Sequence, residues 1–197
     1  SDTVILVGET NAASLSGVET ITGSSGDDSV TISTNEIETV SGGAGIDEVV
    51  LTDDQGNTLE LDGVETITGS SGADSLTIST SDIETVKGGA GIDEVILTDA
   101  TGNTLELEGV ETVTGSSGID EVILTDEFGA SIEISDVETV VGGLGADNLT
   151  ISTSDIEIVT GGGGIDEVIL TDATGNTVEL DGVETVTGGS GLDTVFL

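Results

Sequence analysis

One phrase recurs eight times along this chain: an apolar residue, Glu, usually Thr and another apolar residue lead into a glycine-rich turn that ends in Asp. Successive copies are separated by either nineteen or twenty-seven positions. The first glycines of the eight turns are Gly23, Gly42, Gly69, Gly88, Gly115, Gly142, Gly161 and Gly188. A repeat of this length predicts a solenoid, because each unit can bury its apolar side only against its neighbours.

Apolar and polar residues alternate between the turns. The segment 74–80 places Leu76 and Ile78 on one face, and the segment 93–99 places Val95 and Leu97 on one face. Alternation with β-branched residues between glycine clusters is typical of β-strands, and no segment has helical spacing. We therefore expect an all-β, parallel β-solenoid over residues 1–197, with an inward ladder of Val30, Val49, Leu76, Val95, Val122, Leu149, Val168 and Val195.

The two spacings predict alternating short and long coils, of nineteen and twenty-seven residues respectively. Nine residues separate the Glu from the turn Asp in every copy, as between Glu84 and Asp93. This constant part predicts that all the glycine turns stack in a single row on one edge, in eight layers, with the length variation on the opposite edge. The extra residues of the long units form either a wider coil or a hairpin, and the sequence leaves both open.

The charge of the chain restricts its partners. Forty acidic residues against one basic residue, Lys87, give a formal net charge of −39. Binding to nucleic acid or to anionic membrane surfaces requires Lys and Arg, so both are excluded as partners. No apolar run is long enough for membrane insertion. The chain is expected to attract cations.

The side chains that common catalysis needs are absent. The sequence contains no His and no Cys, so triads, thiol nucleophiles and soft-metal sites are missing. Paired carboxylates could hydrolyse glycosides, but Phe128 and Phe196 are the only aromatic residues, too few for a sugar platform. We therefore do not expect an enzyme. Oxygen ligands are abundant and suit a hard cation such as Ca²⁺.

The turns have the residues of a calcium site. Five turns read G-G-x-G-x-D and three read G-S-x-G-x-D. With the residues that follow, the turns resemble the calcium-binding nonapeptide of the RTX (repeats-in-toxin, hemolysin-type) β-roll family. The phrase V-E-T-V-T-G before the turn is similar to the lead-in of that family. The resemblance covers nearly the whole chain.

The resemblance implies that backbone carbonyls and Asp side chains of successive turns bind Ca²⁺. The carboxylates would be those of Asp28, Asp47, Asp74, Asp93, Asp120, Asp147, Asp166 and Asp193. The glycines would be Gly42, Gly43, Gly45, Gly88, Gly89, Gly91, Gly142, Gly143, Gly145, Gly161, Gly162, Gly164, Gly188, Gly189 and Gly191. Serine at positions 24, 70 and 116 would weaken those sites. In the alternative interpretation, the glycines only make tight turns and each Asp caps backbone N–H groups.

The chain is expected to be uncapped at both ends and to be a segment of a longer array or fibre, because it starts at Ser1 and stops within a strand at Leu197. We expect an extracellular or cell-surface structural protein, such as a stalk, surface-layer or matrix filament, that associates with itself or with further repeats. One alternative is a calcium-triggered folding module of a larger secreted enzyme or toxin. Another is an ion-independent β-filament.

Overall fold

The computed structural model describes residues 2–197 and contains two parallel sheets of 11 strands each. The odd-numbered strands form the first sheet. They are β1 (Thr3–Ile5), β3 (Thr20–Thr22), β5 (Thr39–Ser41), β7 (Thr58–Asp62), β9 (Ser75–Ile78), β11 (Glu94–Leu97), β13 (Thr112–Thr114), β15 (Ser131–Ser135), β17 (Asn148–Ile151), β19 (Glu167–Leu170) and β21 (Thr185–Thr187).

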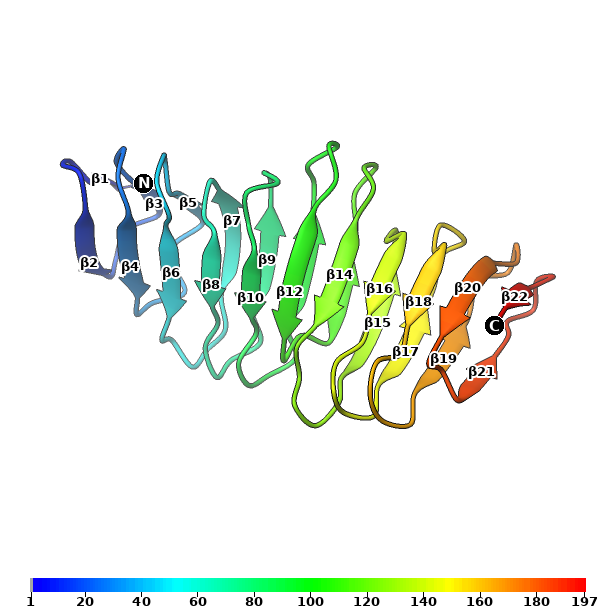
Figure 1. The fold of residues 1–197 in the computed structure, drawn as a ribbon. Coiled ribbons are helices and arrows are strands. Elements are labelled where there is room, and N and C mark those ends of the chain that lie inside the picture. Colours follow the sequence, from blue (N-terminus) through cyan, green and yellow to red (C-terminus); the bar gives the residue numbers. More distant parts are fainter. Residues whose placement is uncertain (1) are drawn as a thin grey trace.

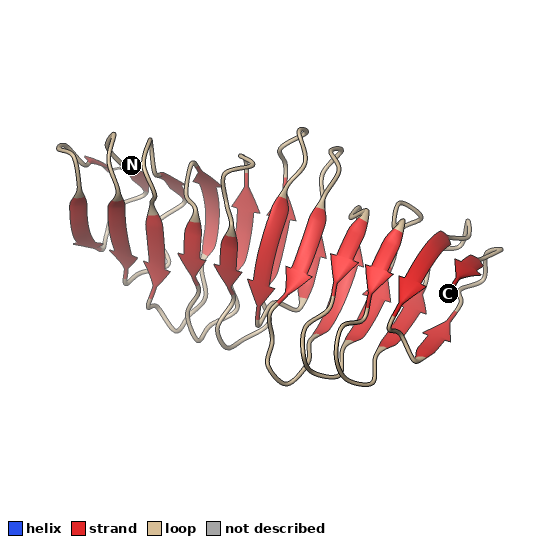
Figure 2. Cartoon of the chain, viewed as in Figure 1, coloured by secondary structure: helices blue, strands red, loops and turns tan. Residues whose placement is uncertain are grey.

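The even-numbered strands form the second sheet. They are β2 (Asn11–Leu15), β4 (Asp28–Ile32), β6 (Glu48–Leu51), β8 (Thr66–Thr68), β10 (Thr85–Lys87), β12 (Thr104–Glu108), β14 (Glu121–Leu124), β16 (Thr139–Val141), β18 (Ile158–Thr160), β20 (Thr177–Asp181) and β22 (Thr194–Phe196). All connections are loops and turns, and Figure 2 shows no helix in the described part of the chain. In particular, residues 2–197 include no helix long and apolar enough to cross a membrane.

The chain winds steadily from one end of the sheets to the other, so that each strand pairs with the strand two places along (Figure 1). Thr58 pairs with Ser75 and Thr39 pairs with Glu60, so one coil advances the sequence by between seventeen and twenty-one positions. At about 4.8 Å between neighbouring strands, the 11 strands of each sheet extend roughly 50 Å. The predicted parallel β-solenoid is confirmed.

The core lies between the sheets and consists of aliphatic side chains in stacked rows. Leu76, Val95 and Val113 are successive partners in the first sheet, and each is at most 1 % exposed. Thr and Glu alternate with them on the outer faces, as period two requires. Of the expected inward ladder, all residues are buried except Val195, which is 36 % exposed in the last strand. The ladder is divided between the two sheets.

The predicted division into coils is wrong. A long unit contains three strands and a short unit contains two, as β11, β12 and β13 compared with β9 and β10 show. The long unit therefore makes one and a half coils of ordinary width. The hairpin alternative is wrong too, because all strand pairs are parallel. The solenoid has 11 layers and not the expected eight, because all coils contain strands of similar length.

The predicted single row of glycine turns is also wrong, for the same reason. An odd number of strands carries the next turn to the other edge of the solenoid. The turns 23–28, 42–47, 115–120 and 188–193 follow odd-numbered strands and lie on what we call the first edge. The turns 69–74, 88–93, 142–147 and 161–166 follow even-numbered strands and lie on the second edge.

Candidate metal centre

The eight Gly-Asp turns differ in what lies one coil before them on the same edge. Three of them stack directly on another Gly-Asp turn, and we call these the trailing turns: 42–47 on 23–28, 88–93 on 69–74, and 161–166 on 142–147. The turns below them, together with the unpaired turns 115–120 and 188–193, are the leading turns. The structure thus brings six of the eight turns together in pairs and leaves two alone.

The first position of each turn has no room for a side chain, so only glycine fits there. A Cβ atom on Gly42 would lie 2.0 Å from the carbonyl oxygen of Gly63 in the next coil and 2.5 Å from the Asp47 carboxylate. A Cβ on Gly88 would meet Gly109 O and Asp93 in the same way, at 2.0 and 2.7 Å. The backbone therefore presses against a carbonyl and a carboxylate oxygen, which are both ligands that Ca²⁺ prefers.

One oxygen of each turn carboxylate accepts a backbone N–H of the preceding coil. Asp28 N donates to Asp47 Oδ1 at 2.8 Å, and Asp74 N donates to Asp93 Oδ1 at 2.7 Å. In a leading turn the donor is the residue that ends the turn below, such as Asn57 N to Asp74 Oδ1 at 2.7 Å. The interpretation that the aspartates cap backbone N–H groups is thus confirmed for one oxygen of each carboxylate.

In the leading turns the second carboxylate oxygen is satisfied as well. It accepts the N–H of the second residue of its own turn, as Ser24 N donates to Asp28 Oδ2 at 2.6 Å and Gly143 N to Asp147 Oδ2 at 2.9 Å. Ser70 Oγ adds a contact of 3.1 Å to Asp74 Oδ2. In a leading turn, both carboxylate oxygens are therefore satisfied by hydrogen-bond donors of the protein.

In the trailing turns the second oxygen has no such donor. Oδ2 of Asp47, Asp93 and Asp166 is buried without a hydrogen-bond partner within residues 2–197. The cause is the backbone, because the second residue of each trailing turn adopts a left-handed conformation, with φ of 106° at Gly43, 102° at Gly89 and 91° at Gly162. Serine occupies this position only in leading turns, where no left-handed φ is required.

The pKa values of Asp28, Asp47 and Asp93 follow the same division. Burial raises the pKa of Asp47 above its usual value, and the nearby carboxylates of Glu65 and Asp28 add to the shift. Burial likewise raises the pKa of Asp93. Burial also acts on Asp28 in a leading turn, but hydrogen bonds from Ser24 and Asn11 outweigh it and the pKa is lowered. A buried carboxylate with one free oxygen is therefore costly to ionise without a cation.

Glutamates one coil later accept hydrogen bonds from four of the turn aspartates. The sequence interpretation missed this role of the glutamates. Glu65 and Glu111 accept the backbone N–H of Asp47 and Asp93, and Glu138 and Glu184 accept those of Asp120 and Asp166. The available signal is the spacing of 18 residues from each Asp to the Glu one coil later, which is visible only once the coil length is known.

Comparison with known proteins gives one match. The family model described as "RTX calcium-binding nonapeptide repeat (4 copies)" matches residues 15–31 and 61–77, which contain the leading turns 23–28 and 69–74 with their lead-ins. These two segments are therefore similar to RTX calcium-binding repeats. RTX repeats imply Ca²⁺ as the bound ion. No curated protein and no solved structure matches the chain.

The paired turns fit the ion that RTX repeats bind. Each pair combines a buried free carboxylate oxygen with the carbonyl groups of two glycine-rich turns, and both are Ca²⁺ ligands. Within residues 2–197, no three acidic side chains converge to hold an ion by themselves, so carbonyls must supply much of the coordination. Three pairs have this donor set, and the unpaired turns 115–120 and 188–193 lack the free oxygen.

All the expected site residues lie in these turns, but on two edges. Seven of the eight turn aspartates are at most 3 % exposed, and Asp193 in the last turn is more accessible. The expected glycines divide in the same way. Those of 42–47, 88–93 and 161–166 belong to trailing turns, and those of 142–147 and 188–193 belong to leading turns. Their role as metal ligands stays a prediction.

Proposed function

We propose that this chain is an extracellular structural repeat protein, a stalk, surface-layer or matrix filament, that Ca²⁺ rigidifies by binding between paired Gly-Asp turns. RTX repeats typically occur in secreted proteins and are typically not catalytic, which supports this class of function. The observation that carries the proposal is the buried, unpartnered Oδ2 of Asp47, Asp93 and Asp166 within the described residues. Ca²⁺ at these atoms removes the cost of a buried anion and links coils that are far apart in sequence.

Rigidity follows from where the ions bind. The net charge of −39 opposes a compact rod, and carboxylates one coil apart repel each other. A divalent ion between two turns offsets this repulsion and uses carbonyls that are together only in the stacked state. Binding is therefore coupled to folding, because the unfolded chain has no such site.

The proposed partners are further coils of the same kind. β1 and β2 at one end, and β21 and β22 at the other, each have a paired neighbour on one side only within the described chain. Additional repeats or another copy of the chain can extend the two sheets by the same parallel pairing. Such growth lengthens the rod without changing its cross-section, as a filament requires.

Chelation tests this function directly. Far-UV circular dichroism and small-angle scattering are recorded in Ca²⁺ and after addition of EGTA at neutral pH. We expect a β spectrum and a rod about 50 Å long in Ca²⁺, and loss of both in EGTA. An unchanged spectrum and length after chelation, with no Ca²⁺ bound to the chain, would identify an ion-independent filament instead.

A further inference from the structure

Three asparagines outside the Gly-Asp turns have an unsatisfied buried oxygen. Asn57, Asn103 and Asn176 each end a T-D-x-x-G-N turn and are at most 2 % exposed. The side-chain oxygen Oδ1 of each has no hydrogen-bond partner within residues 2–197. A buried amide oxygen without a partner destabilises the folded state, so its occurrence at three equivalent positions needs a cause.

Taken together, the three equivalent positions place a group that can only accept hydrogen bonds on each side of the amide. Asn57 and Asn103 donate Nδ2 forward to the carboxylates of Asp74 and Asp120, both at 3.0 Å. Asn176 donates Nδ2 backward instead, to the carbonyl of Thr153 in the preceding coil at 2.7 Å. The oxygen and the nitrogen are on opposite sides of the amide, so either orientation leaves Oδ1 facing an acceptor.

Among the turns that follow another turn on the same edge, Asn occurs at this position only where one particular turn precedes it. In the coil before Asn57, Asn103 and Asn176, the same edge has an S-T-x-x-I-E turn, whose Thr is 23 residues earlier in each case: Thr34, Thr80 and Thr153. The fourth interior copy, 125–130, has a different turn before it and ends in Ala130. Ala130 still donates its backbone N–H to Asp147, so the hydrogen bond to the Gly-Asp turn above does not require the Asn side chain.

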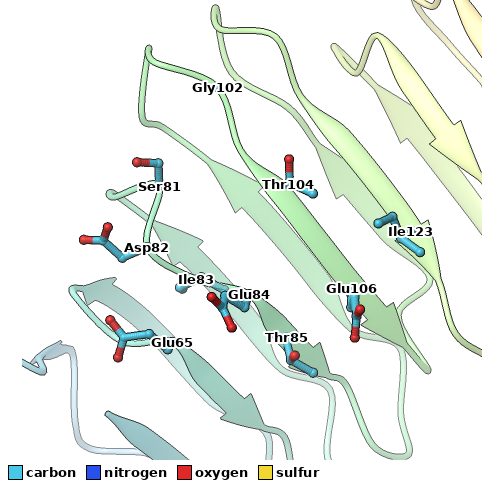
Figure 3. Close-up of a pocket in the computed structure, with 10 residues that line it drawn as sticks. All are labelled: Glu65, Ser81, Asp82, Ile83, Glu84, Thr85, Gly102, Thr104, Glu106 and Ile123. Carbon is cyan, nitrogen blue, oxygen red and sulfur yellow. The ribbon is translucent and has the colours of Figure 1, made fainter. Parts of the chain in front are cut away.

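A surface groove lies beside each S-T-x-x-I-E turn. The groove near Asn103 has a volume of about 670 Å³ and is lined by residues from both turns, including Ser81, Asp82 and Gly102, with Glu84 and Glu106 beside them (Figure 3). Grooves of about 740 and 560 Å³ are lined by residues of the other two S-T-x-x-I-E turns, such as Glu36 and Asp155, and of the strands that follow Asn57 and Asn176. The acidic groove gives a cation a favourable approach to the junction of the two turns.

We propose that each junction between an S-T-x-x-I-E turn and the following T-D-x-x-G-N turn binds an additional Ca²⁺ ion, distinct from those of the Gly-Asp turns. Its ligands are the Asn Oδ1 and the carbonyl oxygen of the Thr in the S-T-x-x-I-E turn. At Thr153/Asn176, where Nδ2 now donates to that carbonyl, the side-chain amide turns over to present Oδ1 to the ion. The ion supplies the positive partner that two facing acceptors need, and the anionic surroundings favour a cation over a neutral ligand. The chain has three such junctions, at Thr34/Asn57, Thr80/Asn103 and Thr153/Asn176.

The test compares Ca²⁺ stoichiometry in the full chain, by metal analysis after dialysis, with a variant carrying Asn57→Ala, Asn103→Ala and Asn176→Ala. Ala130 shows that alanine fits this position. We expect the variant to lose about three ions per chain relative to the wild type. Crystals of the wild-type chain should show anomalous density for Ca²⁺ beside Asn103 Oδ1. An unchanged stoichiometry, with density for water only, would overturn the proposal.

Two controls separate this site from the Gly-Asp turns. Ala130→Asn should add no ion, because no S-T-x-x-I-E turn precedes it, and a gained ion would contradict the role of the Thr carbonyl. Asp47→Asn, Asp93→Asn and Asp166→Asn together should remove ions from the paired turns while the density beside Asn103 persists. Loss of that density in the aspartate variant, with its β spectrum retained, would overturn the separate site.

Discussion

The turns 23–28 and 42–47 are neighbours on one edge and share the pattern G-x-x-G-x-D, yet their carboxylates have opposite hydrogen-bonding environments. Asp28 receives donors on both oxygens, from Asn11 and from Ser24 of its own turn. Asp47 receives one donor on Oδ1, from Asp28, and none on Oδ2 from the described residues. The pKa of Asp28 is accordingly lowered and that of Asp47 is raised.

The difference shows that position in the stack, and not the motif alone, determines what a turn can bind. The turns 142–147 and 161–166 both read G-G-x-G-x-D, but only the trailing one has the left-handed second glycine and the free oxygen. A G-G-x-G-x-D turn has a free carboxylate oxygen only when another Gly-Asp turn lies below it. If this oxygen is the metal ligand, as we propose, the motif alone over-counts sites.

The largest effect should come from placing the same side chain in the two kinds of turn. Gly89 in a trailing turn has φ of 102°, and its Cβ would lie 2.1 Å from Ser70 O. Gly143 in a leading turn has no left-handed φ, and its Cβ would lie 3.0 Å from Asp126 O. We expect Gly89→Ser to lower the free energy of unfolding by about 2–4 kcal/mol.

The matched control Gly143→Ser should cost about 1 kcal/mol or less, since serine already occupies this position in three leading turns. Urea denaturation of both variants in saturating Ca²⁺ measures the two values. Equal losses would show that the two kinds of turn do not differ in backbone conformation.

A smaller effect is expected in the pH dependence of the calcium-free chain. Because the pKa of Asp47 and Asp93 is raised in the folded state, these groups favour folding at acid pH. That stability is lost as the pH rises from about 3.9, the ordinary aspartate pKa, through the raised folded values. In EGTA, where we expect the chain to be unfolded at neutral pH, the far-UV β signal should therefore increase as the pH is lowered from neutral toward the raised values.

The comparison between the two turns supplies the control for this titration. Asp47→Asn combined with Asp93→Asn should flatten the pH dependence. Asp28→Asn should not flatten it, because the lowered pKa of Asp28 acts in the opposite direction and its contribution is lost only on acidification. A wild-type β signal in EGTA that stays absent from neutral pH down to about pH 5 would contradict the assignment of free oxygens to the trailing turns.

The smallest effect should come from the serine hydroxyls of the leading turns. Ser70 satisfies Asp74 mainly through its backbone N–H, at 2.7 Å, while its hydroxyl contacts are 3.1 and 3.3 Å long. Ser70→Ala keeps the N–H, so we expect a loss of about 0.5–1 kcal/mol in urea denaturation. A loss as large as that of Gly89→Ser would mean that the Ser70 hydroxyl, and not the backbone N–H, is the main hydrogen-bond donor to the Asp74 carboxylate.

The strands, the buried faces and the turn residues could be predicted from the sequence, because period two and glycine are local signals. Leu76 and Val95 are buried as expected, and all eight turn aspartates lie in the predicted turns. The coil length could not be predicted from the longer spacing between glycine turns, since neither Gly102 nor Asn103 reveals whether the chain turns back or continues to the other edge. In the structure the chain continues, and the coils stay regular in length throughout.

The pairing of turns was missed for the same reason. Whether Asp93 stacks on Asp74 or on another residue depends on which edge each turn occupies, and an error of one strand reverses the edge. The free oxygens follow from that stacking and from the left-handed φ of Gly43, Gly89 and Gly162. No single repeat contains this information, because it arises between coils.

The most direct test of the account is a Ca²⁺ count on two sets of variants of the full chain, with a β spectrum recorded for each. Asp47→Asn, Asp93→Asn and Asp166→Asn together should remove about three ions per chain, because each takes away the free oxygen of one pair. Asp120→Asn, in an unpaired turn whose carboxylate is already satisfied, should remove none. Loss of an ion with Asp120→Asn, or retention of all ions in the triple variant, would contradict binding by paired turns.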